Sequence, residues 1–367
     1  MKRHLALLLM LITCSTVAYG ENYLLNGGQT SRIQYKMVQT VEPNPAIHTL
    51  NLSYVIPATY KSPTYNQTIT NFNFDFSPQP QNREEFTDQR GNKVIKVSWQ
   101  KPTSTIRSVI SLLADNKTIL QEIKTTTPFP FSNVPQDIQP YLTATKQVPV
   151  TDPAIIAKAK ELTAGSKTEF DAVQRILSWV IDHMNYVLTP QDYGAMYSFK
   201  TGKGNCQNYS HLSAALMRAV GIPARIVNGI TLKQPYTVKM KDGSMTLKMA
   251  EGRHSWIEVY FPDLGWVPFD PQQTQLFVSN RFIRVEVGLD NEETSQDGLI
   301  RWTQVRAELA SPQFEETIES SFLGDTVDLT AQKQTYGPSK VLFTPSVSAT
   351  FQPVALVKEP PPPPKIP

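Results

Sequence analysis

The chain has 367 residues, of which 40% are hydrophobic and 18% are charged, which is ordinary for a globular protein and long enough for two domains. The formal net charge of +3 is too small to indicate nucleic-acid binding, and no basic patch is interleaved with aromatic residues. Beyond the N-terminus, no segment is apolar enough to span a membrane. We therefore expect neither a nucleic-acid partner nor a transmembrane segment in the mature chain.

The first 20 residues have the pattern of a secretion signal. Basic residues 2–4 precede an apolar run over residues 5–12, and residues 18–20 fit a small-x-small cleavage site. We predict a signal peptide over residues 1–20 and export to the periplasm or the medium. Residues 11–14 weakly resemble a lipoprotein box, but Thr13 fits it poorly, so we do not expect a lipid anchor at Cys14.

Residues 21–148 are predicted to be rich in β-strands. Apolar side chains alternate with other residues in several short runs, which is typical of strands with one buried face. No comparable helical pattern occurs there, so we expect a β-sandwich-like domain. The alternating residues are Leu50, Leu52, Tyr54 and Ile56, then Phe72, Phe74 and Phe76, then Ile95, Val97 and Trp99.

Helical patterns begin at Asp152-Pro153, an N-cap followed by proline at the first helical position. Ser166 and Glu169 have the spacing of a capping box before a second amphipathic helix. We place a second domain at residues 149–312. The remaining residues 313–367 are predicted to form an irregular extension that ends in a proline-rich tail.

Cys206 is predicted to be the only thiol of the mature chain, because Cys14 lies in the signal peptide. One thiol cannot form an internal disulfide, so this residue needs another explanation. Gly204 and the potential N-cap Asn205 place Cys206 in the first turn of a helix that ends near Gly221. Backbone N–H groups there lower a cysteine pKa and can bind an oxyanion.

His254 and Asp270 lie in two strand-like runs on either side of the turn sequence at residues 262–265. The apolar residues of both runs are odd-numbered, so the even-numbered His254 and Asp270 share the opposite face. As direct or diagonal neighbours, Asp270 would orient the imidazole while its other nitrogen meets the sulfur of Cys206. The apolar set consists of Ile257, Val259, Phe261, Val267 and Phe269.

Several neighbours of these residues are candidates for supporting roles. Asn205 and Gln207 flank the thiol, where they could stabilise an oxyanion or, for Asn205, only cap the helix. Trp256 and Trp266 share the face of His254, and Tyr209 lies one turn after Cys206. These three aromatic residues are candidates for a substrate wall, with packing as the alternative. The scattered histidines offer no metal-ligand cluster, so we expect neither a metal nor another cofactor.

Three blocks of the sequence together resemble the transglutaminase-like superfamily, cysteine enzymes with a papain-like core. The first block is Gly204-Asn205-Cys206-Gln207-Asn208-Tyr209-Ser210 with Leu212, followed by Ala215-Leu216-Met217-Arg218-Ala219-Val220-Gly221-Ile222-Pro223-Ala224-Arg225. The other two are His254-Ser255-Trp256-Ile257-Glu258-Val259-Tyr260 and Gly265-Trp266-Val267-Pro268-Phe269-Asp270-Pro271. The resemblance covers about residues 150–290. Gln207 stands where animal transglutaminases carry tryptophan, so the animal-type subgroup does not fit.

The resemblance implies an α+β fold, in which N-terminal helices pack on an antiparallel sheet behind a β-sandwich-like domain. It also implies a thioacyl mechanism in which Cys206 attacks a carbonyl, His254 transfers the proton and Asp270 orients the imidazole. The substrate would be a protein or peptide, with the cell envelope as one source, and the acyl acceptor would be water or an amine. We slightly favour water. The alternative is an inactive binding or scaffold protein that keeps the fold.

Overall fold

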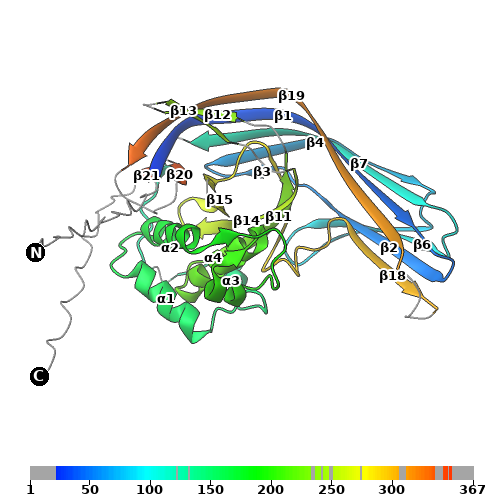
Figure 1. Cartoon of the computed structure of the whole chain (residues 1–367), viewed down its shortest axis with the longest axis horizontal. Helices are drawn as coiled ribbons and strands as arrows, with labels where there is room; N and C mark the ends of the chain where they lie inside the picture. Colours follow the sequence, from blue (N-terminus) through cyan, green and yellow to red (C-terminus); the bar gives the residue numbers. More distant parts are fainter. Residues whose placement is uncertain are drawn as a thin grey trace, which may run out of the picture.

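The computed structural model describes residues 22–120, 123–130, 133–232, 236–240, 243–247, 251–272, 275–305, 311–334, 342–345 and 347–348. The predicted signal peptide, Cys14 and the proline run at residues 360–364 lie outside these ranges. Long strands form an arch above a smaller body of helices and strands (Figure 1). The fold is α+β, as predicted.

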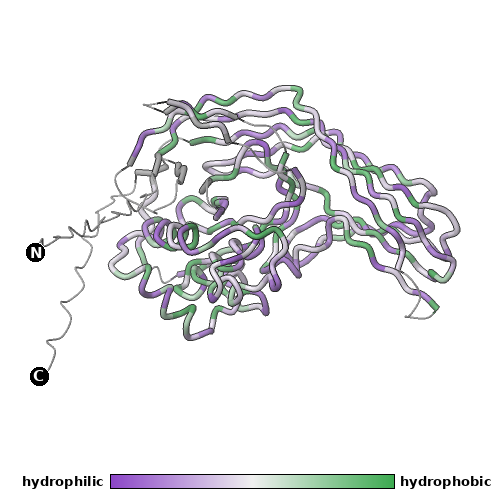
Figure 2. Tube along the Cα trace, viewed as in Figure 1, coloured by the Kyte–Doolittle hydropathy of each residue, from purple (hydrophilic) through white to green (hydrophobic). Residues whose placement is uncertain are grey.

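The arch is built from two facing sheets. Along one, β1 pairs with both β19 and β7, and β7 pairs with β4, which carries β3; the other has the order β18-β2-β6-β5. Hydrophobic and hydrophilic residues alternate along these long strands (Figure 2), as expected for strands with one face in a core. The strands are β1 (Asn22–Glu42), β2 (Ile47–Ile56), β3 (Tyr60–Lys61), β4 (Tyr65–Ser77), β5 (Asn82–Thr87), β6 (Lys93–Gln100), β7 (Ile106–Leu120), β18 (Leu299–Gln304) and β19 (Gln313–Gln334).

The two sheets share one hydrophobic core, which confirms the predicted sandwich-like part. Its buried members include most of the alternating residues that predicted strands: Leu50, Leu52, Tyr54, Phe76, Ile95, Val97 and Trp99. Residues 33–41 of β1 and 106–114 of β7 supply the facing layer. Ile283 and Val285 of the second body join the same cluster, so the core continues across the boundary between the two parts.

The prediction of an irregular extension from residue 313 is wrong for β19. This 22-residue strand pairs with β1 along its whole length, from Gln313 opposite Glu42 to Gln334 opposite Asn22. Most of its side chains are exposed or only half-buried, so the main-chain ladder holds it and no strong apolar alternation marks it in the sequence. β18 also returns from the second half of the chain, to pair with β2.

The second body consists of helices packed on an antiparallel sheet with the strand order β15-β14-β11-β17. All five odd-numbered apolar residues of the predicted strands lie in its core, against the helices. The main elements are α1 (Pro153–Thr163), α2 (Glu169–His183), α3 (Ala195–Thr201), α4 (Cys206–Ala219), β11 (Ala224–Thr231), β14 (Gly252–Phe261), β15 (Gly265–Gln272) and β17 (Phe282–Gly288). Smaller elements are β8 (Ile123–Lys124), a 3₁₀ turn (Gln139–Leu142), β9 (Asn185–Tyr186), β10 (Lys203–Gly204), β12 (Tyr236–Met240), β13 (Gly243–Leu247), β16 (Gln275–Phe277), β20 (Leu342–Pro345) and β21 (Val347–Ser348).

Side chains cap the first turns of α1 and α2, and the cap of α2 differs from the predicted one. Asp152 caps α1 by accepting hydrogen bonds from the N–H groups of Ala154 and Ile155, as predicted. The N-cap of α2 is Thr168, whose hydroxyl accepts from the N–H of Asp171. The expected capping box of Ser166 and Glu169 is therefore wrong.

The outer edge of β17 is covered by side-chain amides of the arch. The side chain of Gln67 accepts from the N–H of Arg284 (2.8 Å) and donates to its carbonyl (2.9 Å). Asn92 does the same for Val287, at 3.0 and 2.8 Å. Both amides are buried. A buried strand edge without partners would leave costly unpaired N–H and C=O groups, so these amides join the two bodies into one unit.

Gln67→Ala should lower the free energy of unfolding by about 2–4 kcal/mol, because it leaves one buried N–H and one buried C=O of Arg284 without partners. Urea unfolding measures this loss. Asn73→Ala on the same strand is the matched control, since its side chain is exposed, and should change stability by less than about 0.5 kcal/mol. Equal effects of the two variants would contradict the edge-covering role of Gln67.

Glu169, the first residue of α2, is fully buried, and neither carboxylate oxygen has a hydrogen-bond partner among the described residues. Burial raises the pKa of Glu169 to about 9, and the charge of Asp263 adds to this effect. Asp263 itself remains a carboxylate. Burial alone would raise its pKa, but hydrogen bonds from Thr125, Thr126 and Thr127 lower it. The Glu169 carboxyl is therefore neutral at physiological pH.

Glu169→Gln should gain stability relative to the wild type as the pH rises. Unfolded glutamate ionises near pH 4.3, whereas the folded group ionises only near pH 9, so wild-type stability falls across that window. The neutral glutamine carries no such penalty. Urea unfolding at pH 4.5 and pH 8 tests the expectation, with the exposed Glu161→Gln as control. A stability difference between wild type and variant that is the same at both pH values would contradict it.

Candidate active site

Cys206 is the first residue of α4, directly after a capped helix start. The Asn205 side chain accepts from the N–H of Gln207 (3.1 Å), while the Asn208 side chain accepts from the N–H of Asn205 (3.2 Å). Gly204 allows this arrangement, because a Cβ at that position would lie 2.3 Å from the Asn208 side chain. The cap places the sulfur at the positive end of the helix dipole.

The structure brings Cys206, His254 and Asp270 together. The Cys206 thiol is hydrogen-bonded to His254, and the His254 Nε2 lies 2.8 Å from Asp270 Oδ2. The strand ladder pairs Ile257 with Phe269, which makes Asp270 a diagonal cross-strand neighbour of His254, one of the two predicted registers. The three side chains thus form a chain from sulfur through imidazole to carboxylate.

The charges of this group favour an ion pair between sulfur and imidazole. Burial alone would raise the pKa of Cys206, but the hydrogen bond and charge of His254, with the N–H of Ser255, bring it below its ordinary value. For His254, burial alone would lower the pKa, yet the Asp270 charge and hydrogen bond raise it to about 10. A thiolate beside an imidazolium is the reactive form of a cysteine nucleophile.

Aromatic rings enclose the imidazole on the side away from the helices. The Phe282 ring meets that of His254 edge to face, with centroids 5.2 Å apart and an interplanar angle of 83°. Trp256 packs against both rings, at 5.8 Å from His254 and 5.4 Å from Phe282. Low polarity around a paired charge strengthens its interactions. Phe282 is the first residue of β17 and was not among the site residues predicted from the sequence.

The N-terminal half of α4 holds a loop that flanks the thiol. Asn208 donates to the carbonyl of Asp192 (3.0 Å), and His211 donates through Nδ1 to that of Tyr193 (2.7 Å). Both side chains are fully buried, and burial lowers the pKa of His211 to about 4. Sequence reasoning missed these roles, although polar residues three apart on the buried face of a helix are a recognisable signal.

The predicted supporting residues have other roles here. The Asn205 side chain accepts from the Gln207 N–H and donates to the Leu188 carbonyl. Asn205 and Gln207 are therefore part of the helix cap. Trp256 and Tyr209 are fully buried and therefore do not form an exposed substrate wall. Trp266 stacks under the Arg225 guanidinium, 4.0 Å from the ring centroid, where it packs the sheet.

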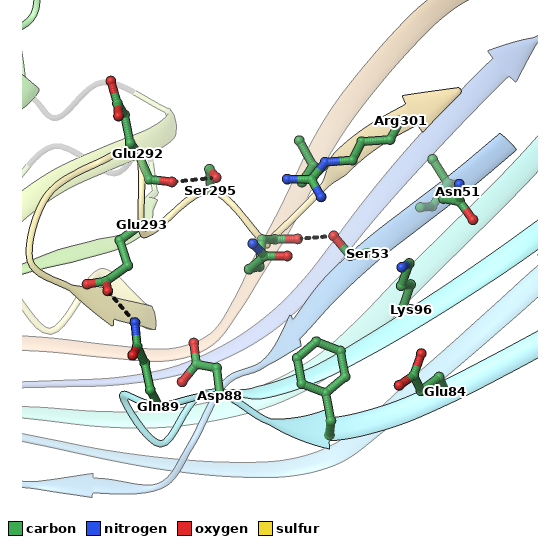
Figure 3. A pocket seen from close by; sticks show the side chains of 14 residues that line it. Asn51, Ser53, Glu84, Asp88, Gln89, Lys96, Glu292, Glu293, Ser295 and Arg301 are labelled. Atoms are coloured by element: carbon green, nitrogen blue, oxygen red, sulfur yellow. Dashed lines mark hydrogen bonds between the residues drawn. The ribbon is translucent and has the colours of Figure 1, made fainter. Parts of the chain in front are cut away.

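A polar hollow of about 510 Å³ opens elsewhere, between the four-stranded sheet and residues 292–296 (Figure 3). Its lining includes none of Cys206, His254 and Asp270. Glu293 at its rim is bound by Gln89 (2.8 Å) and Arg90 (2.9 Å). Across the described ranges, no group of three or more His, Cys, Asp or Glu side chains is arranged to hold a metal.

A helix that presents a cysteine beside a histidine and an aspartate on an antiparallel sheet is the arrangement expected of a transglutaminase-like core. Comparison with known proteins agrees, since the model of the transglutaminase-like superfamily matches residues 156–271. This segment, which contains Cys206, His254 and Asp270, is the part of the chain that is similar to the superfamily.

Three relatives show how far the similarity extends. The uncharacterized protein YebA of Bacillus subtilis is 33% identical over 121 residues, 31% of this chain and 16% of that protein. An uncharacterized Haemophilus influenzae protein is 28% identical over 198 residues, 49% of this chain and 53% of that protein. A protein-glutamine gamma-glutamyltransferase of Pseudomonas aeruginosa is 33% identical over 90 residues, 23% and 13% of the two chains. The chain thus covers at most about half of these relatives.

The fold extends beyond the matched segment. A crystal structure of a Cytophaga hutchinsonii protein superposes on 84% of this chain and 100% of its own, with a TM-score of 0.58 and 17% identity. The arch and the enzyme-like core therefore occur together in another protein. In the part of the chain that the structure describes, no helix is both long and apolar enough to cross a membrane.

The lowered pKa of Cys206 predicts that iodoacetamide alkylates the wild-type thiol at a lower pH than an ordinary thiol. His254→Ala removes the positive partner but not the burial, so it should move the midpoint of the rate–pH profile up to about 8.5, the value of an ordinary thiol, or above it. The rate of alkylation between pH 5 and pH 10 measures both midpoints. Midpoints that coincide near 8.5 in the two proteins would rule out a histidine-paired thiolate.

Proposed function

We propose that this protein is an exported cysteine enzyme that cleaves or transfers acyl groups at amide bonds of proteins or peptides. The observation that carries the proposal is the hydrogen-bonded chain from the Cys206 sulfur through His254 to Asp270 at the start of a helix. The match of residues 156–271 to the transglutaminase-like superfamily supports the same reaction class. Export is supported by the signal-like pattern of residues 1–20.

The first half of the reaction forms a thioester. The Cys206 thiolate attacks the carbonyl carbon, and the oxyanion accepts from the backbone N–H of Cys206 at the helix start. Nε2 of His254 faces Asp270, which leaves Nδ1 for the proton transfer. The imidazolium protonates the leaving nitrogen as the C–N bond breaks, so the amine departs neutral and the acyl group stays on sulfur.

The second half returns the enzyme to its starting state. Neutral His254 removes a proton from water or from an amine as that acceptor attacks the thioester carbonyl. The C–S bond then breaks, which releases an acid or a new amide and restores the thiolate–imidazolium pair. We favour water slightly as acceptor, because water is the default acceptor unless a site excludes it.

Asp270→Asn should reduce the catalytic rate by about 10²–10⁴-fold, because the amide no longer supports the imidazolium. Cys206→Ala should remove all activity. Internally quenched peptides report hydrolysis, and a glutamine-containing peptide with a fluorescent amine reports transfer to an amine. A folded wild-type protein that does neither on a broad peptide panel would favour the scaffold alternative, in which Cys206→Ala leaves the cellular phenotype intact.

A further inference from the structure

Three exposed side chains with large apolar parts lie on the segment that adjoins the nucleophile. They are Tyr186, Leu188 and Tyr193, which are 48%, 73% and 40% exposed, and the Leu188 carbonyl accepts from Asn205, next to Cys206. Burial raises the pKa of Tyr186, and the negative charge of the nearby Cys206 thiolate raises it further. The phenol therefore lies close to the nucleophile. Large apolar side chains gathered on a soluble surface commonly mark a binding site.

This loop is held rigidly although its side chains face solvent. The N–H groups of Asn185 and Val187 donate to the carbonyls of Gly202 (2.7 Å) and Gly204 (2.9 Å), just before the nucleophile. Asn205 donates to the carbonyl of Leu188, and the buried His211 to that of Tyr193. A preorganised apolar surface loses little entropy when a ligand binds.

We infer that Leu188 and Tyr193 bind an apolar or aromatic side chain of the polypeptide substrate, next to the amide that Cys206 attacks. This inference rests on the proposed function. The occupant is a substrate side chain because the surface adjoins the sulfur through the Leu188–Asn205 hydrogen bond. Leu188 and Tyr193 would contact the substrate through their side chains, whereas their main-chain carbonyls hold the loop in place. A side-chain substitution can therefore remove the substrate contact and keep the loop attached.

The test uses two inhibitors that alkylate Cys206 and differ only in one side chain, an acylated phenylalanine and an acylated alanine chloromethyl ketone. The wild type should react faster with the phenylalanine compound. Leu188→Ser and Tyr193→Ser should each lower the Phe/Ala ratio of inactivation rates by about 5–10-fold, as expected when apolar contact is lost. Leu323→Ser, which alters another exposed leucine, on β19 (61% exposed), should leave the ratio unchanged.

Iodoacetamide, which carries no side chain, separates the outcomes. If it alkylates all variants like the wild type at pH 6 while the Phe/Ala ratio falls only in the two loop variants, the inference holds. An unchanged ratio with normal iodoacetamide reactivity overturns the inference and leaves the proposed function standing. If the wild-type thiol is not alkylated at any pH below that of an ordinary thiol, about 8.5, the proposed function fails and the inference falls with it.

A second inference rests on a different observation, the carbonyls of residues 278–282. Side chains of the arch donate to three of them. Thr118 binds Val278 (3.0 Å), Ser31 and Asn116 bind Asn280 (2.7 and 3.0 Å), and Asn116 and Tyr65 bind Phe282 (2.8 and 2.6 Å). All four side chains are buried. Five buried hydrogen bonds thus hold the segment that presents the Phe282 ring to His254.

We propose that the β-rich arch positions the catalytic imidazole, with Asn116 and Phe282 as positioning residues. Asn116 holds two carbonyls of the segment, and the Phe282 ring meets the imidazole at 5.2 Å. His254 must keep both the Asp270 and the Cys206 hydrogen bonds, so a tilt of its ring weakens the ion pair. This proposal also rests on the proposed function.

Asn116→Ala and Asn92→Ala form a matched pair, because both remove a buried amide that joins the arch to the second body. The carbonyl bound by Asn92 belongs to Val287, further along β17 and opposite Val227. Asn116→Ala should slow iodoacetamide alkylation at pH 6 by about 10-fold or more and raise the midpoint of the pH profile. Asn92→Ala should lose comparable stability and keep the wild-type profile.

Phe282→Leu covers the case in which Asn116→Ala does not fold. It keeps the main-chain hydrogen bonds, removes the ring edge and should raise the alkylation midpoint in the same direction. Wild-type pH profiles for Phe282→Leu, or equal changes in Asn116→Ala and Asn92→Ala, would mean that the arch only stabilises the fold, which overturns the proposal. A wild type that itself lacks low-pH reactivity would instead reject the proposed function.

Discussion

The open edge of β17 is the constraint on which the rest of the structure depends. The core sheet ends at this strand, and its main-chain groups are buried under the arch, where water cannot satisfy them. Gln67 and Asn92 replace a neighbouring strand by offering one donor and one acceptor each. The shared apolar core from β1 to Val285 adds hydrophobic burial to this junction. Neither body is complete without the other.

The same junction contains a buried carboxylate that is paired with two guanidinium groups. Glu258 lies fully buried between Arg225 and Arg284, both 2.6 Å away, and these two guanidinium groups lower its pKa to about 2 although burial opposes this. Arg284 also stacks on the Tyr60 ring of the arch, 4.3 Å from its centroid. The carboxylate accepts from both guanidinium groups, whereas removal of Glu258 would leave two neighbouring cations without their shared partner. The group lies on the face of β14 that also carries His254.

Much of the site could be predicted from local pattern. The alternation of apolar residues in β14 and β15 assigned His254 and Asp270 to one face, and the Asn205 cap placed Cys206 at a helix start. These features depend on neighbours in the chain or across one turn. Phe282, Asn116 and β19 could not be predicted in the same way, because their partners lie more than 20 residues away and their own sequence has no strong periodicity. Glu169 was predicted to take part in a capping box, but it is buried, and the spacing of a capping box in the sequence does not reveal burial.

The sequence by itself determined the candidate nucleophile, its helix position and the shared face of its two partners, because helix caps and strand parity are local properties of the chain. Only the tertiary structure decided which groups tune and support that set. The His254 pKa depends on Asp270 and the thiolate, and the ring packed on His254 depends on side chains of β1, β4 and β7. Such effects arise from distances between segments far apart in sequence, and the packing of the two bodies sets those distances.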